Sequence, residues 1–437
     1  MLLNQLRYVV TAHWRSHAGL NGLPATSSSD EDTSLPRIPA RALVICSALL
    51  ALATLASPAV AQADVLHGVV YADANANGKR DASERAMPGV MVSNQRDIVV
   101  TDSLGRFEIS RSSTGIVFVS VPDGFRSSGP FWRTTSASPP SLDFGLVHEK
   151  QSRNFSFVHA SDPHIQPKNV DRFHRFRQMA DSLSPAFVLM GGDLIYDAMS
   201  QTEARAKSFF DLYVTESKAF HTPVWNVPGN HDHYGIIRTS SHADPANPLY
   251  NRGMYRQYFG PDYYSFTYGG VHFIGLNTIS PDDSAYYGDV DSVQVEWLKR
   301  DLAHVPAEMA VVTFNHIPFY SSWTTLGSYD EDPLVATLAK VNGKKQFRHT
   351  VGNFDAVLNA MRGHRYVLSL GSHMHVAEQV SFVTDGVQLR SDVCAAIVSG
   401  QDLGTVIVPS GFRVYEVRDG KIDLGRFVRL DPPGAKP

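Results

Sequence analysis

Cysteine is scarce in this chain, which has only Cys46 and Cys394 among its 437 residues. Cys46 lies in an N-terminal segment that reads as a cleaved export signal, so the mature chain keeps a single cysteine. A single cysteine closes no internal disulfide and offers at most one thiolate to a zinc ion. A disulfide scaffold and a cysteine-rich zinc site are therefore both excluded.

An excess of charge of either sign is also lacking. The 39 Lys and Arg residues are set against 43 Asp and Glu residues, which gives a formal net charge of −4. This balance provides no basis for a nucleic-acid-binding surface. Long apolar runs are missing as well, because the clearest one covers only residues 42–55 and a bilayer needs about 20 residues. We expect no membrane span in the mature chain.

The beginning of the chain has the pattern of a secretory signal. Arg37 and Arg41 precede the apolar residues 42–55, and Ala61-Gln62-Ala63 provides an A-x-A cleavage site. We expect residues 1–63 to be a leader and signal peptide. The mature protein is then exported, either to the periplasm or out of the cell.

Residues 64–147 predict a small all-β sandwich domain. Short runs rich in β-branched residues alternate there with turn signals such as Asn77-Gly78 and Pro88-Gly89. Residues 73–84 also fit the calcium-loop pattern D-x-N-x-N-G-x5-E. The side chains at its ligand positions are Asp73, Asn75, Asn77, Asp81 and Glu84. Strands, and not helices, flank this segment, which leaves two interpretations open: a calcium site, and an Asx-rich turn without an ion.

From residue 155 the chain alternates apolar strands with helical stretches, which is typical of an α/β domain. The predicted strands cover residues 155–160, 187–190, 224–227, 272–277, 309–314 and 366–370, and the predicted helices cover residues 170–184, 203–220, 292–304 and 353–362. Short strands return after residue 376. They form either the second half of a β-sandwich or a small appended β domain.

Five short motifs each follow a predicted strand and carry metal-ligating side chains. They are Asp162-Pro163-His164, Gly192-Asp193, Gly229-Asn230-His231-Asp232, Asn315-His316 and Gly371-Ser372-His373-Met374-His375. In layered α/β folds, ligands collect at the carboxyl ends of the strands. The carboxylates and imidazoles are too many for one ion and suit two. Two ions about 3.5–4 Å apart are a common device for displacement at phosphorus. The alternative, a set of capping residues and core histidines, does not account for five motifs in this order.

The order and spelling of these motifs resemble those of the calcineurin-like metallophosphoesterases, over roughly residues 155–418. The resemblance implies a four-layer α/β/β/α sandwich as the catalytic domain, residues 148–377, followed by a C-terminal β-rich segment, residues 378–437. Residues 64–147 resemble the transthyretin-like or B-type β-sandwich repeats of secreted bacterial proteins. The expected fold class is therefore α/β with an N-terminal all-β domain.

The resemblance also implies roles for single residues. The first ion is assigned to Asp162, His164, Asp193 and His375, and the second ion to Asp193, Asn230, His316 and His373. A hydroxide bridging the ions is the implied nucleophile. His231 would face the leaving-group oxygen as general acid, and Asp232 would orient the His231 imidazole. Oxygen and nitrogen ligands without thiolate suit two divalent ions of Mn, Fe, Zn or Ni.

Two departures from the family pattern bear on these assignments. The last motif reads Gly-Ser-His-Met-His where the family has Gly-His-x-His, but both of its histidines are kept. Gly192-Asp193-Leu-Ile-Tyr196 matches the spelling of purple acid phosphatases, in which the tyrosine binds ferric iron. That branch lacks a histidine in the first motif, whereas His164 is present here. We therefore read Tyr196 as a packing residue beside the site.

The sequence thus predicts an exported dinuclear-metal hydrolase that acts on a small-molecule or exported phosphoester. The choice between phosphomonoester and phosphodiester stays open, and no substrate-binding residue is assigned. Two long aromatic-rich segments, residues 235–268 and 319–352, either stack on a substrate or pack onto the domain. The alternative function is a secreted calcium-dependent surface-binding protein on a catalytically idle scaffold of the same family.

Overall fold

The computed structural model describes residues 65–135, 141–282, 285–322, 338–341, 344–384, 387–402 and 407–431, and these residues belong to one compact unit. The predicted leader and signal peptide, with Cys46 and the cleavage site at Ala61-Gln62-Ala63, lie outside the described residues. Cys394 is buried and has a free thiol. Within the described ranges, no helix is long and apolar enough to cross a membrane.

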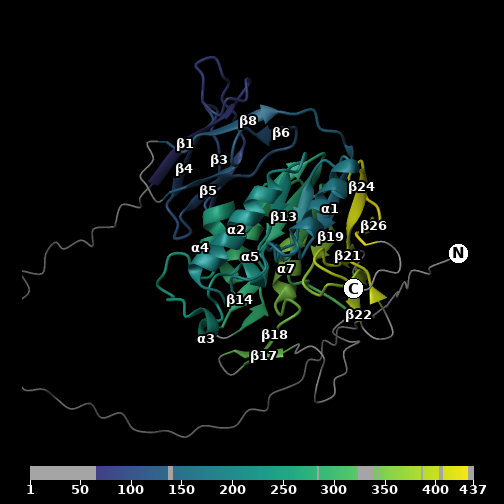
Figure 1. Cartoon of the computed structure of the whole chain (residues 1–437). Helices are drawn as coiled ribbons and strands as arrows, with labels where there is room; N and C mark the ends of the chain where they lie inside the picture. The colour runs from purple at the N-terminus through teal and green to yellow at the C-terminus, as the bar shows by residue number, and fades with distance from the viewer. Residues whose placement is uncertain are drawn as a thin grey trace, which may run out of the picture. The chain divides into compact units, whose positions relative to one another are not determined.

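The first part of the described chain is a sandwich of two four-stranded sheets (Figure 1). One sheet has the order β4-β1-β8-β6 and comprises β1 (Val65–Ala72), β4 (Arg106–Ser110), β6 (Phe125–Ser127) and β8 (Phe144–His148). The other has the order β3-β2-β5-β7 and comprises β2 (Met91–Ser93), β3 (Ile98–Val100), β5 (Ile116–Val119) and β7 (Trp132–Thr134). Burial alternates along β4, where Phe107 and Ile109 face the core. The predicted all-β sandwich is present.

Two mixed six-stranded sheets follow. The first has the order β11-β10-β9-β24-β25, with β26 paired to β24; its strands are β9 (Asn154–Ala160), β10 (Val188–Met190), β11 (Val224–Asn226), β24 (Gly411–Arg418), β25 (Lys421–Ile422) and β26 (Arg426–Arg429). The second has the order β12-β13-β16-β19-β21-β20; its strands are β12 (Tyr264–Tyr268), β13 (Val271–Leu276), β16 (Ala310–Asn315), β19 (Arg365–Gly371), β20 (Glu378–Thr384) and β21 (Val387–Val393).

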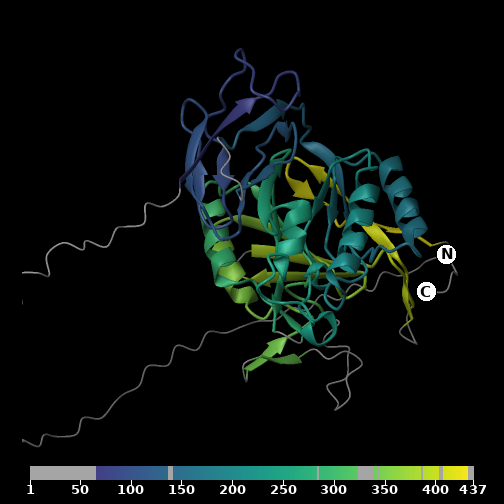
Figure 2. The same ribbon diagram turned by 60° about the vertical axis from the view of Figure 1, so that its left-hand side comes forward.

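Helices cover the outer faces of these two sheets. They are α1 (Val170–Ser182), α2 (Glu203–Ser217), α5 (Ser292–Leu302) and α7 (Phe354–Met361). Neighbouring residues of β9 show why layers form: Phe157 belongs to the core shared with the second sheet, whereas Val158 belongs to the core beneath α1 and α2. Figure 2 shows helices on both sides of the sheets. The expected α/β fold with β-rich regions is confirmed.

The last strands complete both sheets. Strand β24 pairs antiparallel with β9, and β21 pairs parallel with β19. The described part of the C-terminal segment is therefore built into the sandwich, which selects one of the two interpretations that the sequence left open. The domain boundaries at residues 147 and 377 stay predictions.

The aromatic-rich segment 235–268 contains regular secondary structure. It contains α3 (Arg238–Ser241) and α4 (Arg252–Phe259) and ends in β12. In α4, Tyr255 is buried and its hydroxyl donates to the Asn226 carbonyl at 2.9 Å. Phe319 is also buried and stacks on Phe354. The rings of Tyr255 and Phe319 therefore pack in the core. Trp323 lies outside the described residues.

The remaining elements are short. They are η1 (Asn230–Asp232), β14 (Ile279–Pro281), β15 (Tyr286–Gly288), β17 (Leu338–Val341), β18 (Lys344–Phe347), β22 (Gln401–Asp402) and β23 (Ile407–Val408).

Candidate metal centre

The five motifs lie at strand ends or in the turns that follow them. Strands β9, β10 and β11 run parallel in the first sheet, and β16 and β19 run parallel in the second. Their carboxyl ends therefore point to the same edge of each sheet. Apolar strand residues hold the backbone rigidly there, and the polar side chains after the strands meet at that edge.

Several of the candidate ligands have a left-handed backbone conformation. Their φ angles are positive: Asp162 52°, His164 40°, Asp193 50°, His373 71° and His375 54°. Such a conformation costs a non-glycine residue on the order of 1–3 kcal/mol, and it persists where the surroundings fix it. Backbone bonds provide that fixation, since the Asp162 amide donates to the Gly192 carbonyl and the His164 amide donates to the Asp193 carbonyl, both at 3.1 Å. The side chains of these five residues form the two groups of donors described next.

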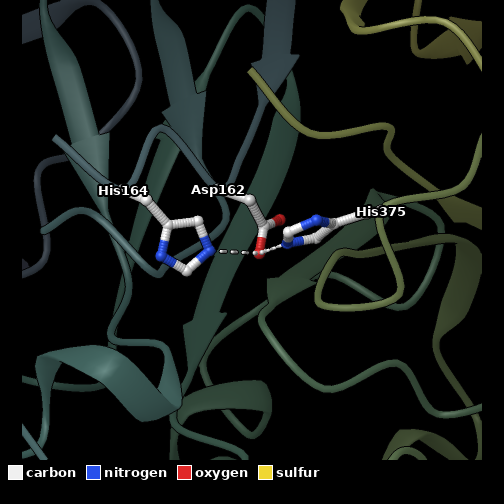
Figure 3. Close-up of side chains that lie close together, drawn as sticks. All are labelled: Asp162, His164 and His375. Atoms are coloured by element: carbon white, nitrogen blue, oxygen red, sulfur yellow. Dashed lines mark hydrogen bonds and ion pairs between the residues drawn. The ribbon is translucent and has the colours of Figure 1, made fainter. Parts of the chain in front are cut away.

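One group of donors consists of Asp162, His164 and His375. Figure 3 shows the two imidazoles on either side of the Asp162 carboxylate. Asp162 Oδ1 lies 3.1 Å from His375 Nε2 and 3.9 Å from His164 Nε2. These are three of the four residues assigned to the first ion.

A second group consists of Asp193, His316 and His373. His316 Nε2 is its centre, 3.3 Å from Asp193 Oδ2 and 3.1 Å from His373 Nδ1. The amide oxygen of Asn230 lies 3.1 Å from the same His316 nitrogen. All four side chains assigned to the second ion thus converge on one place.

Asp193 joins the two groups. The Oδ2 atom that lies 3.3 Å from His316 Nε2 also lies 3.5 Å from His164 Nε2. Its other oxygen, Oδ1, accepts a hydrogen bond from the His231 amide at 2.8 Å. The bond at Oδ1 fixes the carboxylate and leaves Oδ2 between the two sets of donors, as a bridging ligand requires.

The donor set fits divalent cations. His316 Nε2 carries at most one hydrogen, yet a carboxylate oxygen, an amide oxygen and an imidazole nitrogen all point at it. One N–H satisfies only one of these acceptors, whereas a cation satisfies them together. Asp162 and Asp193 are buried, and every ion-pair partner they have among the described residues is a histidine. Oxygen and nitrogen donors of this kind suit Mn, Fe, Zn or Ni.

The electrostatics of the second group attract positive charge. Burial alone would lower the pKa of His316, but Asp193 outweighs it and raises that pKa to about 9. Burial, together with the neighbours His316 and His349, holds the pKa of His373 well below its ordinary value. His373 is therefore neutral and has a lone pair available for a metal ion. The negative charges of Asp193 and Asp162 favour a positive charge beside His316.

The two predicted catalytic residues, His231 and Asp232, contact different parts of the site. The His231 ring meets His164 edge to face at 4.6 Å, and its Nε2 lies 4.0 Å from Asp193 Oδ2, so it borders both groups. The expected contact with Asp232 is replaced: His231 Nδ1 donates to the Tyr196 carbonyl at 2.7 Å. The Asp232 carboxylate instead accepts from the Gly229, Leu194 and Ile195 amides. Successive residues of the short helix η1 point to different sides, so Asp232 orders the loop backbone.

Burial changes the chemistry of Asp232. It raises the pKa of this carboxyl to about 7, because the group is enclosed in the protein and lies close to the Asp193 charge. The Tyr196 ring packs on Phe209 at 5.7 Å and lies beneath the Lys168 ammonium. Tyr196 therefore contributes its carbonyl to the site, while the residue is 38% exposed.

Two residues beside the site were not assigned from the sequence. His349 Nδ1 lies 2.7 Å from His373 Nε2, and the two rings are stacked at 4.9 Å. Tyr286, from β15, meets the His373 ring edge to face at 5.9 Å and lies beneath the Arg348 guanidinium. Neither belongs to a motif, so only their position in the fold identifies them.

The candidate calcium loop closes on itself through hydrogen bonds. The Asp73 carboxylate accepts from the Asn77 and Gly78 amides at 3.1 and 2.8 Å. Asp81 Oδ2 accepts from the side-chain amides of Asn75 and Asn77, and Glu84 accepts from the Ala74 and Asp81 amides. These bonds are compatible with both interpretations, and calcium binding stays a prediction.

A comparison with known protein families gives a match over the middle of the chain. The family described as "Calcineurin-like phosphoesterase" matches residues 155–376. This range includes all five motifs and both groups of donors. It begins in β9 and ends directly after His375.

Similar individual proteins are phosphatases by name. "Serine/threonine-protein phosphatase CPPED1" from Rattus norvegicus is 28% identical over 272 residues, which is 61% of this chain and 78% of that protein. The Mus musculus protein of the same name is 30% identical over 164 residues, 37% of this chain and 47% of its own length. Among solved structures, a dimetal phosphatase from Danio rerio aligns with a TM-score of 0.43 and 15% identity, covering 63% of this chain and 96% of that one.

Proposed function

This chain belongs to the calcineurin-like phosphoesterase family, and from that premise we propose that it is an exported hydrolase of small phosphoesters with a bridged pair of divalent ions. The observation that carries the proposal is the position of Asp193 Oδ2, which is 3.5 Å from one imidazole and 3.3 Å from another that belongs to a separate group of donors. A carboxylate shared between two separate sets of ligands suits two ions better than one.

In this proposal, each group of donors has a defined task. Asp162, His164 and His375 hold one ion, and Asn230, His316 and His373 hold the other, with Asp193 between them. When bound, the ions would lower the pKa of a water nucleophile and neutralise charge on the phosphoryl oxygens. The protein supplies the fixed geometry, since the donors sit on turns that buried strands position.

His231 is proposed to serve the leaving group. Its Nδ1–H donates to the Tyr196 carbonyl, which fixes the ring and leaves Nε2 facing the site. Its side chain is 29% exposed, so a substrate can reach it, whereas the Asp162 side chain is fully buried. A protonated Nε2 in that position donates a hydrogen bond to the oxygen that departs from phosphorus.

The substrate class is drawn from the relatives. Their printed names describe phosphatases that act on phosphorylated serine and threonine, so phosphomonoesters are the first compounds to test. The proposal of export rests on the basic, apolar and A-x-A pattern within residues 37–63. Cell fractionation of the full-length chain tests it: a product shortened by about 63 residues and found outside the cytoplasm supports export.

The decisive experiment measures hydrolysis of aryl phosphate monoesters and diesters with added Mn²⁺, together with the metal content of the protein. Asp193→Asn removes the bridging charge, and we expect kcat to fall about 100-fold or more, a loss of roughly 2.7 kcal/mol of transition-state stabilisation. Bound metal should fall below two ions per chain.

Asp171→Asn is the matched control, because this carboxylate is 99% exposed and is paired only loosely with His174 at 3.7 Å. Its turnover and metal content should equal those of the wild type. If no monoester or diester is hydrolysed with any of the four candidate metals, the hydrolase proposal is wrong. The surface-binding alternative then takes its place.

A further inference from the structure

A side chain of the N-terminal β-sandwich enters the catalytic domain. Gln95 follows β2 with a φ of 67° and is completely buried. Its Nε2 donates two hydrogen bonds across the boundary, to Asp262 Oδ1 at 3.0 Å and to the Tyr263 carbonyl at 3.1 Å. The Tyr263 hydroxyl in turn donates to the Gln95 carbonyl. Both Nε2 hydrogens are used, and this fixes the orientation of the amide, while Oε1 is buried without a hydrogen-bond partner among the described residues.

Asp262 is the centre of the contact. It is fully buried, and it accepts from Arg256 Nε at 2.6 Å, while Arg252 lies 3.6 Å away. Burial alone would raise the pKa of this carboxyl, but the two guanidinium groups hold it well below its ordinary value. Asp262 is therefore a charged acceptor, and its second oxygen accepts from Asn277 Nδ2 at 2.9 Å.

Asn277 carries the contact to the motif that contains Asn230. Its Oδ1 accepts from the Ile279 amide, which fixes the orientation of the side-chain amide. One Nδ2 hydrogen serves Asp262, and the other points at His233 Nε2 at 3.3 Å. His233 Nε2 is then the acceptor, so the hydrogen of this neutral imidazole resides on Nδ1. Nδ1 lies 2.8 Å from the Gly229 carbonyl and donates to it.

Gly229 is closely packed against the metal centre. It directly precedes Asn230, and its amide donates to Asp232 Oδ2 at 2.8 Å. A Cβ at this glycine would lie 2.2 Å from Asp193 Oδ1. The Gly229 backbone therefore packs against the bridging carboxylate on one side and carries Asn230 on the other. A displacement of this backbone would therefore disturb both residues.

We propose that Gln95, Asp262, Asn277 and His233 form a positioning network through which the N-terminal β-sandwich fixes the Gly229–Asn230 backbone at the metal centre. Each hydrogen bond in it pairs a donor with an acceptor: Gln95 and Asn277 both donate to Asp262. Asn277 also donates to His233, and His233 donates to the Gly229 carbonyl. The inference rests on the proposed function, since it deepens the role of that same site. It gives the β-sandwich a part in the reaction, in addition to any ligand of its own.

The first test examines the end of the network. His233→Leu removes the bond to Gly229, whereas in His233→Asn an amide nitrogen takes the place of Nδ1 and can still donate to the carbonyl. Partners that orient metal ligands commonly change metal affinity by about 10–100-fold. We expect His233→Leu to weaken Mn²⁺ binding about 10-fold in a calorimetric titration, and His233→Asn to recover most of the loss.

The second test examines the beginning of the network, far from any substrate. Gln95→Met keeps the size of the side chain and removes its donor. Ser120→Ala is the matched control: Ser120 is buried at the same boundary and bonds to Ser265 at 2.9 Å, but this contact does not lead to Gly229. We expect both variants to lose similar thermal stability. Gln95→Met alone should lower kcat and weaken Mn²⁺ binding, each about 3-fold or more, with KM changed less.

The outcomes distinguish a failure of the positioning network from a failure of the proposed hydrolase function. If Gln95→Met and Ser120→Ala lower the melting temperature equally and leave kcat and Mn²⁺ affinity equal, the residues only hold the boundary together and the positioning role is wrong. The same conclusion follows if His233→Asn binds Mn²⁺ as weakly as His233→Leu. If the wild type hydrolyses no phosphoester, the proposed function fails, and the Mn²⁺ titrations still decide whether the network acts on the metal centre.

Discussion

A single residue outside the motifs, His349, is expected to support a metal ligand. If His373 Nδ1 faces an ion, the hydrogen of this ring resides on Nε2 and is donated to His349 Nδ1, 2.7 Å away. Such partners fix the ring and increase its basicity. We predict that His349→Leu weakens Mn²⁺ binding about 10-fold, measured by equilibrium dialysis.

Two further variants define this prediction. His349→Asn places a side-chain oxygen near the former Nδ1 and should retain most of the affinity. His304→Leu changes an exposed histidine just beyond α5 and should have no effect. Equal affinities for His349→Leu and the wild type would show that the stacked rings touch without consequence for metal binding.

At this scale, the sequence predicts ligands better than their neighbours. The motif side chains of Asp162, Asp193 and His316 were identifiable because each follows an apolar strand, and parallel strands bring their ends together. The Asp232 contact was mispredicted because a tight turn sends adjacent side chains to different sides. His349 and Tyr286 come from segments whose approach to His373 depends on tertiary packing, and nothing local in the sequence indicates it.

Among the elements, the segment from α4 to β12 depends on one buried charge. The substitution Asp262→Asn leaves Arg252 and Arg256 without their shared carboxylate. We predict that it lowers the free energy of unfolding at pH 7 by roughly 3 kcal/mol. The folded-state pKa of Asp262 is depressed. The stabilising effect of the Asp262 carboxylate is therefore fully present when the pH is above the ordinary aspartate pKa of 3.8. It is lost as the pH falls through the folded-state pKa.

The measurement is denaturant unfolding of wild type and variant between pH 7 and pH 3. The difference between them should be constant at neutral pH and should shrink below about pH 4, near the ordinary pKa of an aspartate. Asp97→Asn breaks an exposed pair with Arg300 and should cost less than about 1 kcal/mol. A difference for Asp262→Asn that grows toward low pH would contradict the assignment.

The same segment shows where element prediction fails. Helices α1, α2, α5 and α7 were predicted to within a few residues because apolar side chains recur at helical spacing, as Phe209, Phe210 and Tyr213 do in α2. Helix α4 has eight residues and includes Gly253, so its own helical preference is weak. Packing stabilises it, since Met254 and Tyr255 are both buried. Short elements that depend on tertiary contacts give little signal in a sequence.

For the whole molecule, the boundary between the β-sandwich and the catalytic domain is a buried hydrophobic interface. Trp297 of α5 is completely buried, lies 6.4 Å from Phe118 and 5.1 Å from Tyr263 between ring centroids, and donates from Nε1 to Ser93 Oγ at 3.0 Å. One tryptophan thus packs against both parts of the chain. The sequence predicts a β-sandwich domain over residues 64–147 and a catalytic domain over residues 148–377. It shows where strands end, but not which apolar faces meet.

This boundary predicts that the described unit unfolds as a single body. We expect one calorimetric transition, with equal calorimetric and van't Hoff enthalpies. Trp297→Ala should lower the free energy of unfolding by about 3–5 kcal/mol, because the cavity lies where both parts are anchored. Leu104→Ala, at a side chain that is 51% exposed, should change it by less than about 0.5 kcal/mol. Two resolved transitions in the wild type would show instead that the β-sandwich melts on its own, and a β-sandwich that melts independently could not hold Gly229 in place at the temperature where the enzyme works.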